Sequence, residues 1–151
     1  MSETSIRRGA DSDADAITAL TRDAYAKWIP LIGREPLPMT ANYAEALRSH
    51  RFDLLFADEV LAALIETVPQ DDWLLIENVA VRPAFQRRGY GVRLLRLAES
   101  MAMEAGLRGT RLYTNQRFIA NLALYASLGY RVEREEARNG GVAVHMTKPR
   151  A

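Results

Sequence analysis

Apolar residues in the first third of the chain recur at the spacing of an amphipathic helix. Residues 5–8 predict a short first strand, and Ser-Asp-Ala-Asp at 12–15 has the form of a capping box that would start a helix. We expect Pro30 to end this helix, a loop to follow over 33–38, and a second helix to follow Thr40. The apolar face of the first helix comprises Ile17, Leu20, Ala24 and Trp28.

The middle of the chain predicts three strands. Residues 53–56 and 60–67 are apolar runs separated by a polar pair, which is typical of a hairpin. Residues 73–81 are almost continuously apolar, and Glu77 and Asn78 are the exceptions. Such a run suits a strand that is covered on both faces, so we expect it at the centre of the sheet.

The last part of the chain alternates helices with strands. Gly106 and Gly129 stand where two helices would end, and a loop over 138–141 would join the last two strands. This alternation indicates an α/β layer fold, and the hairpins make its sheet mixed rather than all-parallel. The remaining predicted elements are a helix at 89–105, a strand at 111–114, a helix at 116–128, and strands at 130–134 and 142–147.

Length and composition limit the class of protein. The chain has 151 residues, 48% of them apolar, which is enough for one domain with its own core, placed at 1–151. A net charge of +1 provides no global basic field for nucleic acid, so none is expected as a partner. The absence of cysteine excludes disulfides, thiolate metal sites and a cysteine nucleophile, and we predict no metal site.

The sequence shows no sign of membrane insertion or export. Its apolar runs are all shorter than the roughly 18 residues of a spanning helix. Residues 1–10 lack the apolar segment of a signal peptide. We therefore expect a cytoplasmic protein without a membrane partner.

The stretch VRPAFQRRGYG at residues 81–91 joins the predicted central strand to the next helix. A helix N-terminus leaves about four backbone N–H groups without partners and carries roughly half a positive charge, so it attracts anions such as phosphate. Gly89 and Gly91 would let a bulky group approach the backbone, while Arg87 and Arg88 add positive charge. The stretch predicts a pyrophosphate cradle; the alternative is a tight turn with solvated arginines.

The two best-known phosphate-binding loops do not fit this stretch. A mononucleotide-binding Walker loop needs Lys followed by Ser or Thr after its second glycine, where this chain has Val92 and Arg93. A dinucleotide fingerprint needs a third glycine at the position of Leu94. What remains is the pattern Gln/Arg-x-x-Gly-x-Gly/Ala, which residues 86–91 match at every fixed position.

That pattern resembles the acetyl-CoA-binding motif of the GNAT superfamily of N-acetyltransferases. VAVRP at 79–83 is similar to the family's preceding strand, and NLALYASLGY at 121–130 is similar to its second motif. The order of elements fits from about Ile6 to Lys148. The resemblance implies a GNAT fold with a mixed, splayed sheet of about seven strands and about four helices. It also implies acetyl-CoA as acyl donor, and homodimers are common among such proteins.

The resemblance assigns residues to the acyl donor. The pantetheine arm would lie along the backbone of Val79, Ala80 and Val81, in the gap where the sheet opens. The N–H groups of the cradle would hold the pyrophosphate. The cradle residues assigned in this way are Gln86, Arg87, Arg88, Gly89, Tyr90, Gly91 and Val92.

The second motif places a tyrosine near the sulfur of the donor. Tyr125 matches it, and a phenol could protonate the leaving thiolate; the alternative is a tyrosine that packs the core. The family's asparagine, seven residues earlier, is Phe118 here. Asn121 lies one helical turn before Tyr125 and could substitute for it, unless it is a plain surface residue. Asn115 is expected to cap the helix.

The reaction also needs a base, because a free amine is mostly protonated at neutral pH. Glu77 is the candidate, since it is a carboxylate in an apolar strand just before the donor-binding residues. The alternative is a glutamate at a bulge or paired with an arginine. Two histidines are weaker candidates: His50 is expected to end a helix, and His145 to have a structural role in a terminal strand.

The resemblance places the acceptor against the first two helices and their loop. Tyr25 and Trp28 would give it an aromatic wall, although Trp28 could instead fill the core. Only Glu35 offers a carboxylate there, so no acidic cluster is expected. We expect a primary amine on a small-molecule, amino-acid-like or peptide acceptor. The alternatives are a non-catalytic acyl-CoA sensor on the same fold and a nucleic-acid-binding module that uses the arginines.

Overall fold

The computed structural model describes residues 3–138 and 140–150. Within them one seven-stranded sheet has the order β1-β2-β3-β4-β5-β7-β6. β4 and β5 are parallel and the other neighbours are antiparallel, as predicted for a mixed sheet. The strands are β1 (Thr4–Arg8), β2 (Arg51–Ala57), β3 (Val60–Gln70), β4 (Trp73–Val81), β5 (Gly109–Asn115), β6 (Arg131–Arg138) and β7 (Gly141–Pro149).

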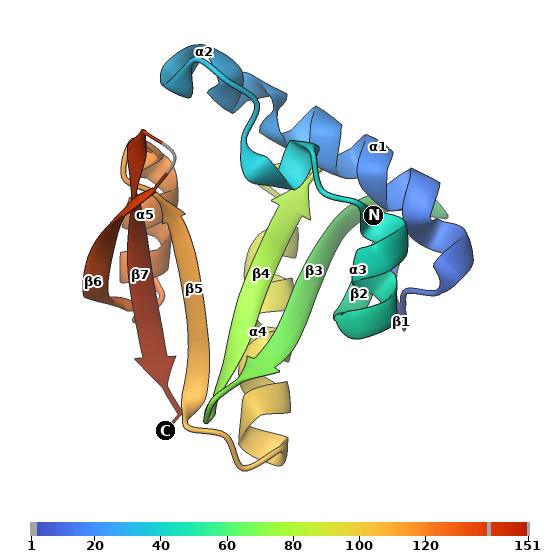
Figure 1. Cartoon of the computed structure of the whole chain (residues 1–151). Coiled ribbons are helices and arrows are strands. Elements are labelled where there is room, and N and C mark those ends of the chain that lie inside the picture. Colours follow the sequence, from blue (N-terminus) through green and yellow to red (C-terminus); the bar gives the residue numbers. More distant parts are fainter. Residues whose placement is uncertain (1–2, 139, 151) are drawn as a thin grey trace.

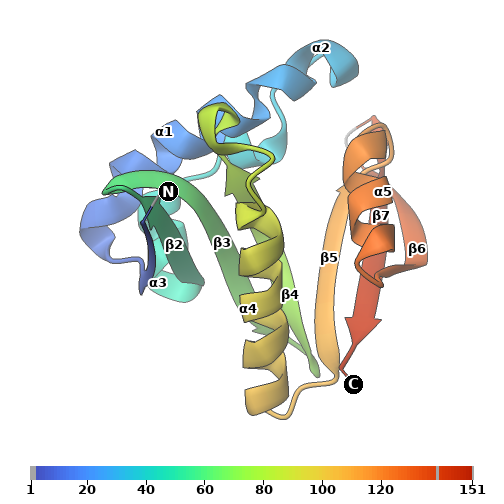
Figure 2. The same cartoon turned by 180° about the vertical axis from the view of Figure 1, so that it is seen from behind.

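The helices cover both faces of the sheet. α1 and α3 lie over one face of β2, β3 and β4, α4 crosses the opposite face, and α5 lies on that opposite side beside β5 and β7 (Figures 1 and 2). The two buried clusters of apolar side chains follow these two faces. The helices are α1 (Ala14–Tyr25), α2 (Ile29–Ile32), α3 (Tyr43–Ser49), α4 (Tyr90–Glu104) and α5 (Ile119–Ser127).

The start of the first helix differs from the prediction. Residues 11–13 form a short 3-10 helix and α1 begins at Ala14, so the capping box expected from Ser12 is wrong. The Asp13 carboxylate does the capping instead, because it accepts the Ala10 N–H at 2.7 Å. A bidentate ion pair with Arg7 holds that carboxylate in place, at 2.8 and 2.9 Å.

The expected stop at Pro30 is also wrong. α1 ends at Tyr25, a 3-10 turn follows over 26–28, and Pro30 lies in the first turn of the short α2. A proline is tolerated there because the first N–H groups of a helix have no intrahelical partner to lose. Gly33, with a φ of 73°, ends α2 in the left-handed conformation.

The other predicted elements are confirmed with shifted bounds. Asp58 and Glu59 both have positive φ, at 49° and 71°, as a two-residue hairpin turn between β2 and β3 requires. His50 ends α3 as expected. α5 starts later than residue 116 and its N-cap is Phe118, so the prediction that Asn115 caps this helix is wrong. The Asn115 side chain accepts the Arg117 N–H at 2.9 Å and holds a turn before the helix. Asn139, in the loop predicted at 138–141, lies outside the described residues.

No helix in the described part of the chain is both long and apolar enough to cross a membrane.

Candidate active site

The sheet opens between its two parallel strands. β4 and β5 pair at Leu74–Thr110, Leu75–Arg111 and Ile76–Leu112, and beyond these pairs the strands diverge (Figure 1). On its other side β4 stays paired with β3 as far as Val81. The backbone of residues 77–81 therefore has one edge that faces the opening, where it can hydrogen-bond to a ligand.

A β-bulge lies at the point where the sheet opens. In the pairing of β3 with β4, Ile76 faces Thr67 and Asn78 faces Glu66, so Glu77 is the extra residue. A regular strand would point successive side chains to opposite faces, and a bulge breaks that alternation. As a result Glu77 and Asn78, although adjacent, both line the same cavity.

A cleft of about 190 Å³ follows the open edge of β4, and we call it the open-edge cleft. Its wall includes all three strand residues that were predicted to lie along the pantetheine arm. Gly91 lines the cleft from α4, and a Cβ there would lie 3.5 Å from Val81 Cγ2. A Cβ at position 91 would thus be in ordinary contact with Val81, and the glycine leaves that space in the cleft free. The three strand residues are Val79, Ala80 and Val81.

The loop before α4 has the backbone of an anion cradle. Gly89 caps the helix with a φ of 80°, and Arg87 is also left-handed, at 66°. Such a conformation costs a non-glycine residue about 1–3 kcal/mol, and it clusters at functional sites. The first helical hydrogen bond at the start of α4 runs from the Arg93 N–H to the Gly89 carbonyl. The amides before Arg93 therefore have no partner within the helix and can donate to a ligand.

The side chains of the cradle are arranged around that backbone. Gln86 donates from Nε2 to the Val81 carbonyl at 3.2 Å and so ties the loop to β4. Arg87 and Arg88 are exposed, and the Arg88 guanidinium lies 5.1 Å from the centre of the Phe85 ring. Tyr90 is buried in the core, so it offers a ligand only its N–H, and Val92 is half-buried.

Two other arginines close to the cradle in sequence are engaged within the fold. Arg82 donates from Nε to the Leu61 carbonyl at 2.8 Å, and Arg93 donates to Thr4 Oγ1 at 2.6 Å. The guanidinium groups of the cradle that stay exposed to solvent are those of Arg87 and Arg88. This suits one small anion better than a long nucleic-acid backbone.

A larger cavity, of about 330 Å³, lies on the other side of the opening. Five aromatic residues line it, so we call it the tyrosine cavity. It meets the open-edge cleft at four residues that line both: Tyr25, Val79, Asn121 and Tyr125. The aromatic residues of its wall are Tyr25, Tyr43, Tyr113, Phe118 and Tyr125.

Tyr125 and Asn121 lie on one face of α5, as their spacing predicts, and both reach the junction of the two spaces. The Tyr125 hydroxyl has no hydrogen-bond partner among the described residues, and its ring packs 6.0 Å from that of Tyr130. Burial raises the pKa of Tyr125 to about 12. The phenol is therefore protonated at neutral pH and can donate a proton.

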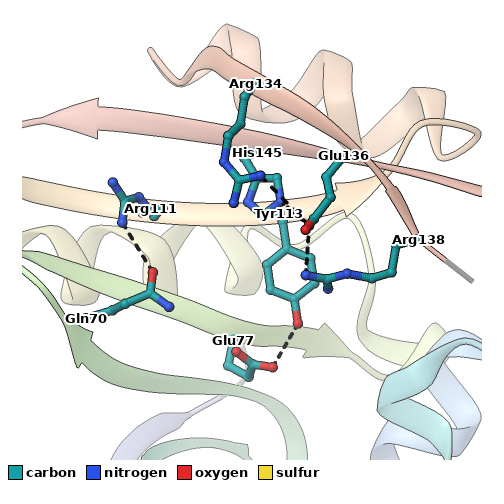
Figure 3. A network of polar contacts seen from close by, with 8 residues as sticks. All are labelled: Gln70, Glu77, Arg111, Tyr113, Arg134, Glu136, Arg138 and His145. Carbon is teal, nitrogen blue, oxygen red and sulfur yellow. Dashed lines mark hydrogen bonds and ion pairs between the residues drawn. The ribbon is translucent and has the colours of Figure 1, made fainter.

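Glu77 is half-buried and is held across the opening of the sheet. The Tyr113 hydroxyl, on β5, donates to Glu77 Oε1 at 2.8 Å (Figure 3). Burial and the neighbouring carboxylate raise the pKa of Tyr113 above its usual range, so it stays a donor. The Arg138 guanidinium lies 5.1 Å from the centre of the Tyr113 ring and donates to Glu136 at 2.9 Å.

A hydrogen-bonded chain on the α1 and α3 side orders the rest of the wall. Tyr25 donates from its hydroxyl to Asn78 Oδ1 at 2.7 Å and approaches the Val79 carbonyl at 3.3 Å. Asn78 in turn donates to the Tyr43 hydroxyl at 3.3 Å. Burial raises the pKa of Tyr25 well above its ordinary value, which keeps this hydroxyl a donor too.

The tyrosine cavity also contains a pair of titratable side chains, the half-buried His50 and the buried Glu66, that the sequence analysis did not bring together. His50 Nδ1 and Glu66 Oε2 are 2.6 Å apart, and both residues line the cavity. Glu66 is only 4% exposed. Its signal in the sequence is a carboxylate inside the apolar run at 60–67.

Three expectations about the residues around the acceptor need correction. Trp28 neither fills the core nor lines the tyrosine cavity; it lines the open-edge cleft and stacks on Phe118 at 4.3 Å. Glu35 pairs with Arg22 at 2.8 Å and does not line the tyrosine cavity. The expected wall, made by the first two helices and their loop without an acidic cluster, is incomplete, because Glu66 and Glu77 line the cavity from β3 and β4.

His145 has the structural place expected of it, buried on β7 and 3.0 Å from Glu136. Among residues 3–138 and 140–150, no group of three or more His, Asp or Glu residues could hold a metal ion.

Comparison with protein families decides what kind of site this is. The model of the Acetyltransferase (GNAT) family matches residues 16–130 of the chain. The chain belongs to the GNAT family of acetyltransferases. The matched segment runs from α1 to the end of the second motif, so it includes the open-edge cleft, the cradle and Tyr125. A search of curated proteins gave no match.

Solved structures of GNAT proteins share the fold over almost the whole chain. A PaiA N-acetyltransferase from Thermoplasma acidophilum, in complex with coenzyme A, has a TM-score of 0.82 at 18% identity, covering 97% of this chain and 99% of its own. The ribosomal-protein-S18-alanine N-acetyltransferase from Escherichia coli has a TM-score of 0.80 at 23% identity, covering 97% and 94%. A GNAT family acetyltransferase from Elizabethkingia anophelis with acetyl-CoA bound has a TM-score of 0.70 at 18% identity, covering 97% of each chain.

Membership of the family confirms the predicted GNAT fold, acetyl-CoA as acyl donor and acetyl transfer as the class of reaction. The residues present fit this donor. Left-handed Gly89 exposes the amides of the α4 N-terminus, Gly91 keeps the cleft clear, and the open edge of residues 77–81 continues from there. An elongated ligand with a pyrophosphate near one end matches this succession of cradle and strand edge.

Proposed function

We propose that this GNAT protein is an N-acetyltransferase that acetylates a primary amine of a small-molecule, amino-acid-like or peptide acceptor in a ternary complex. The observation that carries the proposal is the meeting of the open-edge cleft with the tyrosine cavity at Tyr25, Val79, Asn121 and Tyr125. The donor would occupy the cleft and the acceptor the cavity. Catalysis would come mainly from holding the two together, with acid–base help.

The cleft residues would bind and orient the donor. The amides of residues 87–92 would hold the pyrophosphate, with Gln86 bracing the loop against Val81. The backbone of residues 79–81 would align the arm toward the junction. Bound acetyl-CoA would supply the thioester whose acetyl group is transferred.

The residues at the junction would move protons. Glu77 would take a proton from the acceptor amine through Oε2, because its Oε1 is occupied by the Tyr113 hydroxyl. Tyr125 would supply a proton to the sulfur that leaves. Asn121, on the same face of α5, would order the donor arm or a water beside it.

Some predictions about the whole protein stay predictions. These are a single domain over residues 1–151, a cytoplasmic location and a homodimer.

The proposal is tested by amine-dependent release of the CoA thiol from acetyl-CoA. We expect a panel of small primary amines and amino-acid amides to contain at least one that accelerates release, with the acetylated amine seen by mass spectrometry. Glu77→Gln should lower kcat/KM for that amine by about 10²-fold, because it removes the base while keeping its shape. Glu104→Gln, on the exposed surface of α4, is the control and should retain full activity.

The outcomes separate enzyme from sensor. Binding of acetyl-CoA without acceleration by any amine would contradict an acetyltransferase and favour the non-catalytic sensor. Full activity in Glu77→Gln would show that another group takes the proton.

A further inference from the structure

Glu66 is a carboxylate within a buried stretch of β3, and its partner is His50. β3 buries seven consecutive residues, Leu61 to Thr67, and Glu66 is among them. A charged carboxylate in such a place is destabilising when one of its oxygens lacks a partner. His50 satisfies Oε2, while Oε1 has no hydrogen-bond partner among the described residues and is not one of their fully buried atoms, so it opens onto the tyrosine cavity.

The pair lies within the tyrosine cavity but outside the open-edge cleft. Glu66 faces Asn78 in the register of β3 with β4, and His50 reaches it from the end of α3. The junction with the cleft lies along Val79, Asn121 and Tyr125. An acceptor whose reacting amine stands at this junction would therefore direct a different part of itself toward Glu66.

The chemistry of the wall indicates what that part would be. Burial raises the pKa of Glu66; His50 offsets part of this rise, and the nearby charge of Glu77 adds to it. A cation beside Oε1 would relieve both effects. The aromatic residues that line the cavity are also favourable neighbours for a cation.

The cationic residues of the wall leave Glu66 available. Arg138 is engaged with Glu136 at 2.9 Å and lies against the Tyr113 ring. Arg34 lines the cavity from the loop after α2 and is half-buried. In the described residues, the hydrogen-bonded partner of Glu66 is His50, which engages one carboxylate oxygen.

We propose that Glu66, positioned by His50, is a second recognition site for the acceptor and binds a cationic nitrogen group that the acceptor carries apart from the amine to be acetylated. This inference rests on the proposed function of the tyrosine cavity as the acceptor site. It narrows the acceptor class to molecules with two cationic nitrogens, of which one is acetylated and the other is held by Glu66.

The test compares 1,4-diaminobutane with butylamine, and 1,6-diaminohexane with hexylamine. We expect at least one diamine to bind the wild-type protein about 10-fold or more tighter than its monoamine by calorimetry, since hydrogen bonds to charged groups are the strong ones. Glu66→Gln should bring the ratio close to one while leaving the affinity for acetyl-CoA unchanged. Glu66→Asp, which keeps the charge, should retain part of the preference, and Glu104→Gln should retain all of it.

Binding and turnover give separate answers. Equal affinity for diamine and monoamine in the wild type, or a preference that survives Glu66→Gln, would overturn the recognition site. Acetyl transfer to a monoamine under those conditions would leave the proposed function standing. A diamine preference that depends on Glu66, without acetyl transfer to any amine, would support the site and contradict the proposed function.

Discussion

Gly89→Glu is expected to abolish stabilisation of the protein by acetyl-CoA. Position 89 caps α4 with a φ of 80°, at the centre of the cradle for the pyrophosphate. A carboxylate there would meet the negative charge of the ligand where the helix dipole otherwise attracts it. We expect the Kd for acetyl-CoA to rise about 100-fold or more, which at 100 times the wild-type Kd removes about 2.3 kcal/mol or more of a ligand-induced stabilisation of about 2.7 kcal/mol. Thermal unfolding with and without acetyl-CoA measures this loss.

Gly106→Glu is the matched control for this change. Gly106 follows α4 with a φ of 71°, and a Cβ at either glycine would meet no heavy atom within 4 Å. The two variants share the left-handed backbone, the new charge and a cost of about 1–2 kcal/mol for a side chain in that conformation. Only Gly89→Glu should lose the rise in Tm with acetyl-CoA. If both variants respond to acetyl-CoA like the wild type, the cradle has been placed wrongly.

Tyr125→Phe is expected to lower kcat by about 10²-fold and to leave KM for acetyl-CoA within a factor of about two. The hydroxyl stands at the junction of the open-edge cleft and the tyrosine cavity, where the leaving sulfur would lie. Its removal takes away the proton donor but little of the surface that binds the donor arm. Steady-state kinetics with a saturating amine separates the two parameters.

The raised pKa of Tyr125 adds a prediction about pH. Because burial raises that pKa to about 12, the phenol keeps its proton at all pH values where the protein is assayed. Activity should therefore show no fall attributable to Tyr125 between pH 7 and about pH 10. An alkaline fall near pH 9 that disappears in Tyr125→Phe would contradict this assignment.

Tyr130→Phe serves as the control for the loss of a buried hydroxyl. Tyr130 packs against Tyr125, but its hydroxyl is 2.8 Å from Thr110 and it lines neither the cleft nor the cavity. We expect lower stability, by about 1 kcal/mol, and an unchanged kcat. Equal losses of kcat in the two variants would show that Tyr125 acts through packing.

The cradle could be predicted from sequence because its chemistry is local. Two glycines and a helix start lie within a few residues of one another, and the φ of Gly89 follows from the same short stretch. The shared face of Asn121 and Tyr125 is also local, since it depends only on the period of a helix. The hairpin at Asp58 and Glu59 is local in the same sense.

The acceptor side depends on contacts between distant segments, and these could not be predicted. The bulge at Glu77 brings Glu77 and Asn78 into one cavity, whereas regular alternation would have separated them. Glu66 becomes part of the site only because His50 reaches it from the end of α3. The Tyr113 hydroxyl meets Glu77 across strands that diverge one residue earlier.

The start of α1 shows how tertiary contacts override a local signal. Ser12 has the residue type and spacing of a cap, but it lies inside a 3-10 turn over residues 11–13 whose Asp13 is bound by Arg7 from β1, and α1 begins only after that turn. Trp28 was placed on the acceptor side by its neighbours in sequence. Its stack on Phe118, which lies between β5 and α5, sets its position instead.

The most direct test of the account is a calorimetric titration of the wild-type protein with acetyl-CoA, beside 3′-dephospho-CoA and ATP. The account predicts one site per chain with a Kd in the micromolar range for acetyl-CoA, and much weaker binding of ATP, which lacks the arm that lies along residues 79–81. Absence of heat from acetyl-CoA at millimolar concentration would contradict the central claim that the cradle and the open edge of β4 form the acyl-donor site.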